Sequence, residues 1–240
     1  MFDITKIKGI IFDYGGTIDS NGKHWAEVLW DAYQYHQAPV TKEQFREAYV
    51  QIERHLAVNY IIKPHHNFMD VLKIKTKLQL EYLADKKILP KNDILTDYSL
   101  SISNQCYTFA SDIISKEKPI LKSLHTSYPV VLVSNFYGNI QAALTDFGLR
   151  EYFDEVIESA VVGIRKPNPA IFGLGVDKLG LAPENVVVIG DSYTKDIAPA
   201  ATLGCRTIWL KGQGWGDDSP TATADRIITD FSELKTIFRI

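Results

Sequence analysis

A short stretch near the N-terminus combines residue types that could do chemistry. The apolar run Ile10-Ile11-Phe12 ends abruptly in Asp13, and Gly15, Gly16 and Thr17 follow at once. Apolar runs bounded by glycine indicate buried strands. In open α/β sheets, ligands bind outside the carboxyl ends of the strands. Asp13 is therefore a candidate catalytic carboxylate, although a strand end with Asp13 as a cap beside a tight turn explains this stretch alone equally well.

Three further polar segments follow predicted strands: Ser134-Asn135, Arg165-Lys166-Pro167-Asn168-Pro169, and Gly190-Asp191-Ser192 with Asp196. Asp13 and Asp191 offer hard oxygen ligands, which suit Mg²⁺ together with a backbone carbonyl and water. The Ser134 hydroxyl and the Lys166 ammonium group are able to hold a phosphate. A carboxylate beside them can attack phosphorus. Together these segments predict a magnesium-dependent site for phosphoryl chemistry.

Each of these side chains also has a purely structural interpretation. Asp191 and Asp196 could serve only the start of a helix, and Ser134 could hydrogen-bond a turn. Thr17 could contact phosphate or only brace its turn. Because Asp13 also follows a predicted strand and would face Asp191, metal ligation by Asp191 is favoured over a role as a helix cap. The Lys-Pro-Asn-Pro setting likewise favours a functional role for Lys166.

The elements that must position these residues alternate between strand and helix in the second half of the chain. The predicted strands cover residues 8–14, 128–135, 153–159, 185–191, 206–210 and 226–229. The predicted helices between them cover residues 139–148, 169–180 and 196–204. Such alternation implies a parallel sheet covered on both faces.

The segment that follows the first strand has a different character. Glycine is absent from Lys23 through Tyr137, and apolar residues recur there at helical spacing. The predicted helices include residues 45–56, 68–83 and 95–114. Thr41 with Gln44 forms a capping-box pattern, and Asn67 is a candidate N-cap. We expect residues 21–123 to form a helical cap, and residues 1–20 and 124–240 to form the core.

Composition excludes several classes of function. The 240 residues carry a net charge of −3, which gives no electrostatic footprint for nucleic acid. Cys106 and Cys205 have no metal-site spacing and cannot form a disulfide framework. No signal-peptide pattern or membrane-spanning stretch is present. We expect a soluble cytoplasmic protein without nucleic-acid or membrane partners, and the sequence does not set its oligomeric state.

The motifs around the candidate residues resemble those of a known family. They are Ile11-Phe12-Asp13-Tyr14-Gly15-Gly16-Thr17, Leu132-Val133-Ser134-Asn135, Arg165-Lys166-Pro167-Asn168-Pro169-Ala170-Ile171-Phe172 and Ile189-Gly190-Asp191-Ser192-Tyr193-Thr194-Lys195-Asp196. In this order the sequence resembles the haloacid dehalogenase superfamily, whose members are mostly magnesium-dependent phosphatases. The resemblance implies an α/β fold with a Rossmann-like parallel-sheet core and an inserted all-helical cap. It also implies hydrolysis of a small phosphorylated metabolite through an aspartyl-phosphate.

The resemblance implies roles for individual residues. Asp13 would be the nucleophile, with Lys166 as a second catalytic residue. The implied substrate contacts are Thr17, Ser134, Asn135 and Lys166. The implied Mg²⁺ ligands are Asp13, Asp191 and the backbone carbonyl of Gly15, with Asp196 supporting the site.

Gly15 departs from the family pattern, because the phosphatases carry a second aspartate there that protonates the leaving oxygen. General acid–base catalysis is typically worth ~10²–10⁴-fold in rate. Metal binding should survive this departure, since the family uses only the backbone carbonyl at this position as a metal ligand. The substrate could have a good leaving group, such as an acyl phosphate, or another group could supply the proton. The candidates for that proton donor are Asp19, His24, Glu27, His65 and His66.

Gly15 is also compatible with two different functions. The protein could bind a phosphorylated metabolite without turnover, or it could follow the phosphonoacetaldehyde hydrolases, which use a cap lysine. Lys42 and Lys63 are available for that chemistry. The Gly190-Asp191-Ser192 segment is of the metal-binding phosphatase type and argues against dehalogenation.

Overall fold

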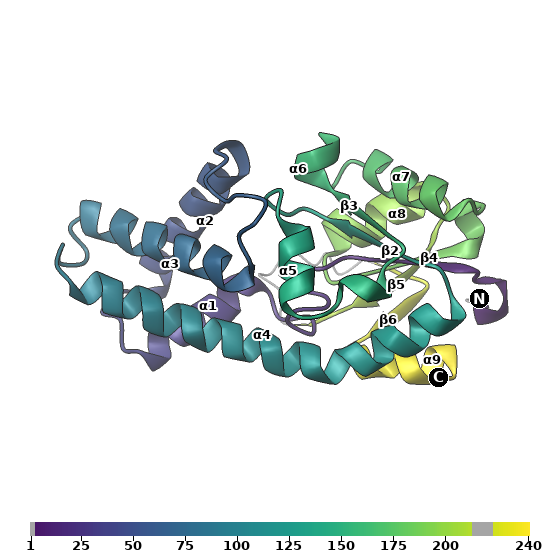
Figure 1. The fold of residues 1–240 in the computed structure, drawn as a ribbon, viewed down its shortest axis with the longest axis horizontal. Coiled ribbons are helices and arrows are strands. Elements are labelled where there is room, and N and C mark those ends of the chain that lie inside the picture. Colours follow the sequence, from purple (N-terminus) through teal and green to yellow (C-terminus); the bar gives the residue numbers. More distant parts are fainter. Residues whose placement is uncertain (1–2, 213–222) are drawn as a thin grey trace.

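The computed structural model describes residues 3–212 and 223–240. Six parallel strands form one sheet in the order β3-β2-β1-β4-β5-β6 (Figure 1). The strands are β1 (Gly9–Phe12), β2 (Val130–Ser134), β3 (Glu155–Glu158), β4 (Val186–Gly190), β5 (Arg206–Leu210) and β6 (Arg226–Ile228). The predicted Rossmann-like parallel sheet is confirmed.

The strand order places β1 at the point where the chain changes direction across the sheet. From β1 the chain passes to β2 and β3 on one side, and then crosses to β4, β5 and β6 on the other. Ligands of open α/β sheets bind at such a switch point. Every residue of β1, β2 and β4 is buried, as expected for strands covered on both faces.

Helices cover both faces of the sheet. They are α5 (Ile140–Asp146), α6 (Ser159–Val162), α7 (Ala170–Leu179), α8 (Ala198–Thr202) and α9 (Leu234–Phe238). Alternate residues of β1 point to opposite faces: Ile11 packs in one apolar cluster with Phe172 of α7, and Phe12 packs in another with Phe231. Short 3₁₀ turns complete this part of the fold at Ile4–Lys6, Arg150–Tyr152, Pro183–Asn185 and Phe231–Glu233.

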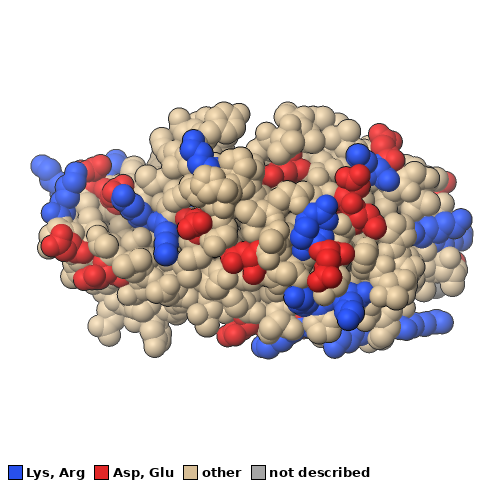
Figure 2. Space-filling model, in the orientation of Figure 1, with Lys and Arg blue, Asp and Glu red and all other residues tan. Residues whose placement is uncertain are grey.

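Between β1 and β2 the chain forms the cap helices, α1 (Trp25–Tyr35), α2 (Lys42–Val58), α3 (Phe68–Asp85) and α4 (Ile94–Ser127), which lie beside the sheet in Figure 1. Thr41 and Asn67 cap α2 and α3, as predicted. Both caps are complete capping boxes, although the sequence predicted a capping box only at Thr41. Among the described residues, none of the helices has the length and apolar character that a membrane span needs. On the face drawn in Figure 2, acidic and basic side chains are interspersed.

The helix α4 is longer than the prediction of residues 95–114. It has 34 residues and continues through Pro119, passing from the other cap helices to the sheet (Figure 1). Ile120, Leu121 and Leu124 are buried and continue its apolar face. The loss of one backbone hydrogen bond at Pro119 is offset by this packing. The expected cap boundary at residue 123 falls within α4 and stays a prediction.

The predicted helix over residues 196–204 forms in two parts. A π-helical turn, Tyr193–Ile197, precedes α8. The Ser192 side chain accepts a hydrogen bond from the Lys195 backbone N–H at the start of this turn. The turn buries Asp196 beneath the end of β4. Wide turns of this kind occur frequently at functional sites.

Candidate active site

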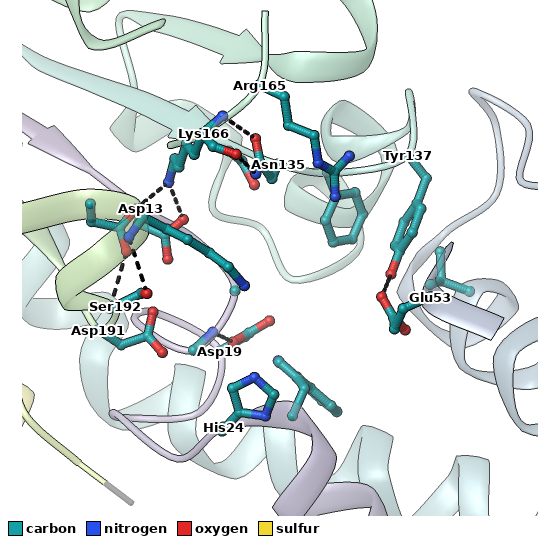
Figure 3. A pocket seen from close by; sticks show the side chains of 18 of the residues that line it. Asp13, Asp19, His24, Glu53, Asn135, Tyr137, Arg165, Lys166, Asp191 and Ser192 are labelled. Atoms are coloured by element: carbon teal, nitrogen blue, oxygen red, sulfur yellow. Dashed lines mark hydrogen bonds and ion pairs between the residues drawn. The ribbon is translucent and has the colours of Figure 1, made fainter. Parts of the chain in front are cut away.

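The residues predicted from the sequence gather at the carboxyl ends of the central strands. Asp13 follows β1, Ser134 ends β2 and Asp191 follows β4. They line a cavity of about 490 Å³ between the sheet and the cap helices (Figure 3). Gly15, Asn135, Lys166 and Asp196 line it as well. The structure therefore brings these residues together. Among the described residues Thr17 is not part of the cavity lining, but it contacts Asp13.

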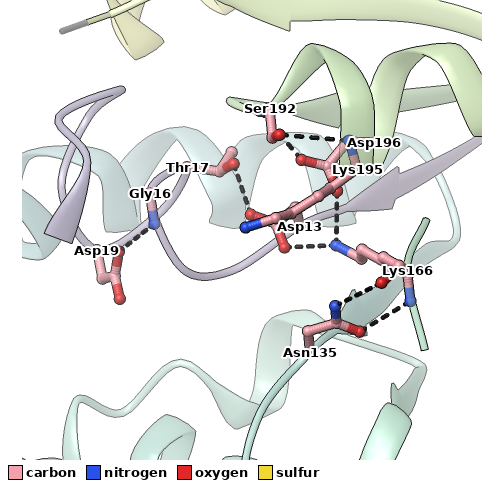
Figure 4. A network of polar contacts seen from close by, with 9 residues as sticks. All are labelled: Asp13, Gly16, Thr17, Asp19, Asn135, Lys166, Ser192, Lys195 and Asp196. Carbon is pink, nitrogen blue, oxygen red and sulfur yellow. Dashed lines mark hydrogen bonds and ion pairs between the residues drawn. The ribbon is translucent and has the colours of Figure 1, made fainter. Parts of the chain in front are cut away.

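The Asp13 carboxylate is held at both oxygens (Figure 4). Its Oδ1 accepts a hydrogen bond from Lys166 Nζ at 2.5 Å, and its Oδ2 accepts one from Thr17 Oγ1 at 2.9 Å. Asp13 is only 6% exposed. Thr17 thus braces Asp13, and a further contact of Thr17 with substrate stays a prediction.

Lys166 is fixed at both its side chain and its backbone. Its Nζ also donates to Asp196 Oδ1 at 2.8 Å. The Asn135 amide accepts from the Lys166 N–H at 3.0 Å and donates to the Lys166 carbonyl at 3.1 Å. Burial opposes the charged form of Lys166, but Asp13 and Asp196 outweigh it and raise its pKa above the ordinary lysine value. Asn135 therefore positions a permanent cation beside Asp13.

Three carboxylates form an acidic cluster at this site. Oxygen atoms of Asp13, Asp191 and Asp196 lie within 4.8 Å of one another. Burial, and then the charges of Asp13 and Asp196, raise the pKa of Asp191 well above its usual range. Burial also raises the pKa of Asp196 to about 6, although Lys166 opposes this shift. A hard divalent cation would relieve this negative charge, so the donor set fits Mg²⁺.

The two adjacent glycines of the first motif have different surroundings. Gly16 has a φ of +99°, and a Cβ there would lie 2.3 Å from Asp191 Oδ2. Any side chain at position 16 would displace the Asp191 carboxylate. A Cβ at Gly15 would have no heavy atom within 4 Å among the described residues. The fold therefore requires glycine at position 16 and leaves room for a side chain at position 15.

Of the candidate proton donors, Asp19 and His24 line the cavity. Burial raises the pKa of Asp19 to about 7, although a hydrogen bond from the Gly16 N–H at 2.8 Å opposes the shift. Burial, and then Lys195 and Lys75, lower the pKa of His24 to about 4. Asp19 is therefore protonated in a substantial fraction of the molecules near pH 7, whereas His24 is neutral there. The described lining does not include Glu27, His65 or His66.

The cap lysine in the cavity is Lys75, which the sequence interpretation missed. Lys42 instead pairs with Glu27 at 2.8 Å, and Lys63 Nζ donates to the Tyr60 carbonyl at 2.7 Å. The position of Lys75 carried a readable signal, because Val71, Lys75 and Gln79 follow one another at intervals of four on a buried face of α3. A lysine on such a face needs partners.

The partners of Lys75 come from the cap and from the loop after β2. Its Nζ lies 2.6 Å from Glu53 Oε1 and donates to the Tyr137 hydroxyl at 3.2 Å. The Tyr137 hydroxyl donates to Glu53 Oε2 at 2.7 Å (Figure 3). Burial opposes the charged form of Lys75, but Glu53 raises its pKa above the ordinary lysine value. Lys75 is thus a buried ammonium ion held in a polar network.

Comparisons with known proteins give relatives over parts of the chain. A phosphoserine phosphatase from Thermus thermophilus is 32% identical over 106 residues, which are 44% of this chain and 42% of the relative. A glyceraldehyde 3-phosphate phosphatase from Methanocaldococcus jannaschii is 33% identical over 96 residues, which are 40% of this chain and 42% of the relative. The chain thus matches less than half the length of these relatives.

Solved structures match almost the whole fold. The putative HAD-hydrolase YfnB from Bacillus subtilis, solved bound to magnesium, has a TM-score of 0.62 at 19% identity, covering 98% of this chain and 99% of that one. The L-2-haloacid dehalogenase from Xanthobacter autotrophicus has a TM-score of 0.60 at 16% identity, covering 97% of this chain and 98% of that one. At these identities the likeness concerns the fold.

The sequence itself decides the family. The sequence profile described as haloacid dehalogenase-like hydrolase matches residues 7–204. This match contains the four motifs and the buried Asp13–Lys166–Asp196 network. The chain belongs to the haloacid dehalogenase-like hydrolases.

Proposed function

We propose that this chain hydrolyses a small phosphorylated metabolite, with Asp13 as the nucleophile. The observation that carries the proposal is the Asp13 carboxylate, held by Lys166 and Thr17 beside two further carboxylates at the floor of a cavity. A cavity of about 490 Å³ accommodates a small metabolite. Names of the partial relatives, which include phosphoserine and phosphoglycolate phosphatases, support phosphate-ester chemistry.

In the proposed reaction, an Asp13 oxygen attacks phosphorus and the bond from phosphorus to the leaving oxygen breaks. Lys166 and the Ser134 hydroxyl hold the phosphoryl oxygens. Water then attacks the phosphorus of the aspartyl-phosphate, releases phosphate and regenerates Asp13. Asp13, Asp191 and the Gly15 carbonyl would hold Mg²⁺, which supplies positive charge to the phosphoryl group. We assign residues 21–123 as the cap that closes over the substrate.

Two routes remain for the proton that the leaving oxygen needs. Asp19 is the candidate donor in the cavity, because it is buried there with a raised pKa. A good leaving group, as in an acyl phosphate, needs no donor. A lysine-based route is disfavoured, because the cavity's cap lysine, Lys75, has a raised pKa and a protonated amine cannot attack a carbonyl.

Gly15 supports a second candidate function, a protein that binds the metabolite without turnover. Position 15 has room for a side chain, so glycine is not forced there by packing. The buried Asp13 speaks for catalysis, because binding alone does not need a nucleophile. The cytoplasmic location predicted from the sequence stays a prediction.

The deciding experiment measures phosphate release with Mg²⁺ from alkyl monoesters, acyl phosphates and phosphonoacetaldehyde. The wild type and Asp13→Asn are compared at matched folding, checked by circular dichroism. We expect turnover that Asp13→Asn abolishes, with acyl phosphates preferred. Turnover that survives in Asp13→Asn would refute the mechanism. Binding of phosphate and Mg²⁺ without turnover of any substrate would establish the binding protein instead.

A further inference from the structure

The cations of the cavity fall into two groups. Lys166 is paired with Asp13 and Asp196, and Lys75 is paired with Glu53. The side chains of the other lining cations form no hydrogen bond or ion pair within residues 3–212 and 223–240. They are Arg54, Arg165 and Lys195. The paired lysines are buried, whereas these three residues are exposed. The second group is therefore available to a ligand.

These three cations serve different parts of the cavity. Lys195 lies on the turn Tyr193–Ile197 after β4, and its side chain passes Asp13 in the view of Figure 4. Arg165 directly precedes Lys166, but its guanidinium lies toward Tyr137, away from the Lys166 amine (Figure 3). Arg54 enters from α2, directly after Glu53. Arg165 from the core and Arg54 from the cap thus both line the cavity, and the Arg165 guanidinium lies away from the Lys166 amine, on the side where the leaving group of the proposed substrate would lie.

The protein's own carboxylates near this region are already occupied. Glu53 accepts from Tyr137 and is paired with Lys75, and Asp19 accepts from the Gly16 N–H. A guanidinium group presents a planar fork that suits a carboxylate or a phosphate. Inside a partly enclosed cavity such a contact is stronger than in water.

We propose that the leaving group of the substrate carries an anion of its own, which Arg165 binds with support from Arg54. The substrate class is a small phosphate compound with a second anionic group, either a carboxylate or another phosphate. Phe68, Val71 and Leu72 line the same cavity and would pack against the short carbon chain between the two anions. This inference rests on the proposed function, because it takes Asp13 as the position of the phosphoryl group.

The test uses non-hydrolysable phosphonates of equal chain length that end in a methyl group, a carboxylate or a second phosphonate. Their affinities are measured by calorimetry in the presence of Mg²⁺. We expect at least one anionic ending to bind about tenfold or more tightly than the methyl ending, as expected for a charge-assisted hydrogen bond. The ending that binds more tightly identifies the second anion.

Arg165→Gln should abolish the tighter binding of the anionic ending and leave the affinity for the methyl-ended phosphonate unchanged. Arg54→Gln should reduce the tighter binding of the anionic ending. Arg46→Gln is the matched control, because Arg46 is an exposed residue of α2 outside the cavity lining. Equal affinities in the wild type, no binding of any phosphonate, or an advantage that survives both substitutions would overturn the inference. Asp13-dependent phosphate release from an acyl phosphate without a second anion tests the proposed function separately, because such a substrate has no group for Arg165 to bind.

Discussion

The adjacent residues Gly15 and Gly16 show how two identical residues can have opposite constraints. Gly16 has a positive φ and lies against Asp191, so no other residue fits without moving a predicted metal ligand. Gly15 borders open space in the cavity. The sequence identified Gly15 as the departure from the family pattern. Only the three-dimensional structure shows that the missing side chain would have room.

We predict that Gly15→Asp folds normally and raises the turnover of alkyl phosphate monoesters by about 10²-fold or more. The new carboxyl group would stand beside the leaving oxygen and supply general acid catalysis. The measurement is kcat/KM for an alkyl monoester, with Gly15→Ala as the control for the added Cβ. An unchanged or lower rate in Gly15→Asp would show that the site does not lack an acid.

Glu117 is a buried carboxyl group outside the cavity. It is 3% exposed, and neither of its carboxyl oxygens has a hydrogen-bond partner in the described chain. Burial raises its pKa from the ordinary value of 4.5 to about 10. The folded protein therefore keeps a proton that the unfolded chain releases above about pH 4.5. This contribution to stability is complete below that pH and is lost as the pH rises toward 10.

We predict that Glu117→Gln flattens the pH dependence of stability. Between pH 5 and pH 7 the wild type should lose at least about 1 kcal/mol more unfolding free energy than the variant, because one pKa unit corresponds to about 1.4 kcal/mol. Urea titrations at several pH values measure this difference. Glu184→Gln, at an exposed position, should behave as the wild type does. Parallel curves for the wild type and Glu117→Gln would contradict the prediction.

At the scale of elements, local sequence patterns predicted the strands and the helix N-caps at Thr41 and Asn67, because both depend on residues close together in the chain. The length of α4 was not predictable in the same way, because a proline within it normally ends a helix and only packing on the sheet carries the helix onward. Lys75 was missed for a related reason. Its partners Glu53 and Tyr137 lie 22 and 62 residues away, on α2 and after β2.

The Tyr137 hydroxyl joins the core to two cap helices, since it donates to Glu53 of α2 and accepts from Lys75 of α3. We predict that Tyr137→Phe loosens α2, speeding amide hydrogen exchange near Glu53 about fivefold, as expected for the loss of a hydrogen bond worth about 1 kcal/mol. Tyr128→Phe is the control, because the Tyr128 hydroxyl has no hydrogen-bond partner within the described ranges. Unchanged exchange would show that this hydrogen bond does not hold the cap.

At the scale of the whole molecule, the parallel sheet concentrates negative charge where its strands end. Asp13 and Asp191 follow adjacent strands, and Asp196 folds back beside them. Lys166 pairs with both Asp13 and Asp196, but its single positive charge cannot neutralise both, so ionisation of Asp191 adds to an excess of negative charge. The motifs predicted this gathering because the ends of parallel strands meet at one edge. They did not predict its electrostatic cost, which depends on burial and distance.

This arrangement predicts a trade between stability and metal binding. Asp191→Asn should raise the melting temperature without metal by a few degrees, because it removes a carboxyl group whose ionisation is disfavoured beside Asp13 and Asp196. Mg²⁺ at about 100 times its Kd should stabilise the wild type by about 2.7 kcal/mol, or on the order of 5–10 °C, and should leave Asp191→Asn unchanged. Calorimetry with Mg²⁺ and with a chelator measures both effects, with the exposed Asp177→Asn as the control. If Mg²⁺ still raised the melting temperature of Asp191→Asn, the metal would be held by other ligands. If the metal-free variant were less stable than the wild type, the charge of Asp191 would be compensated within the fold.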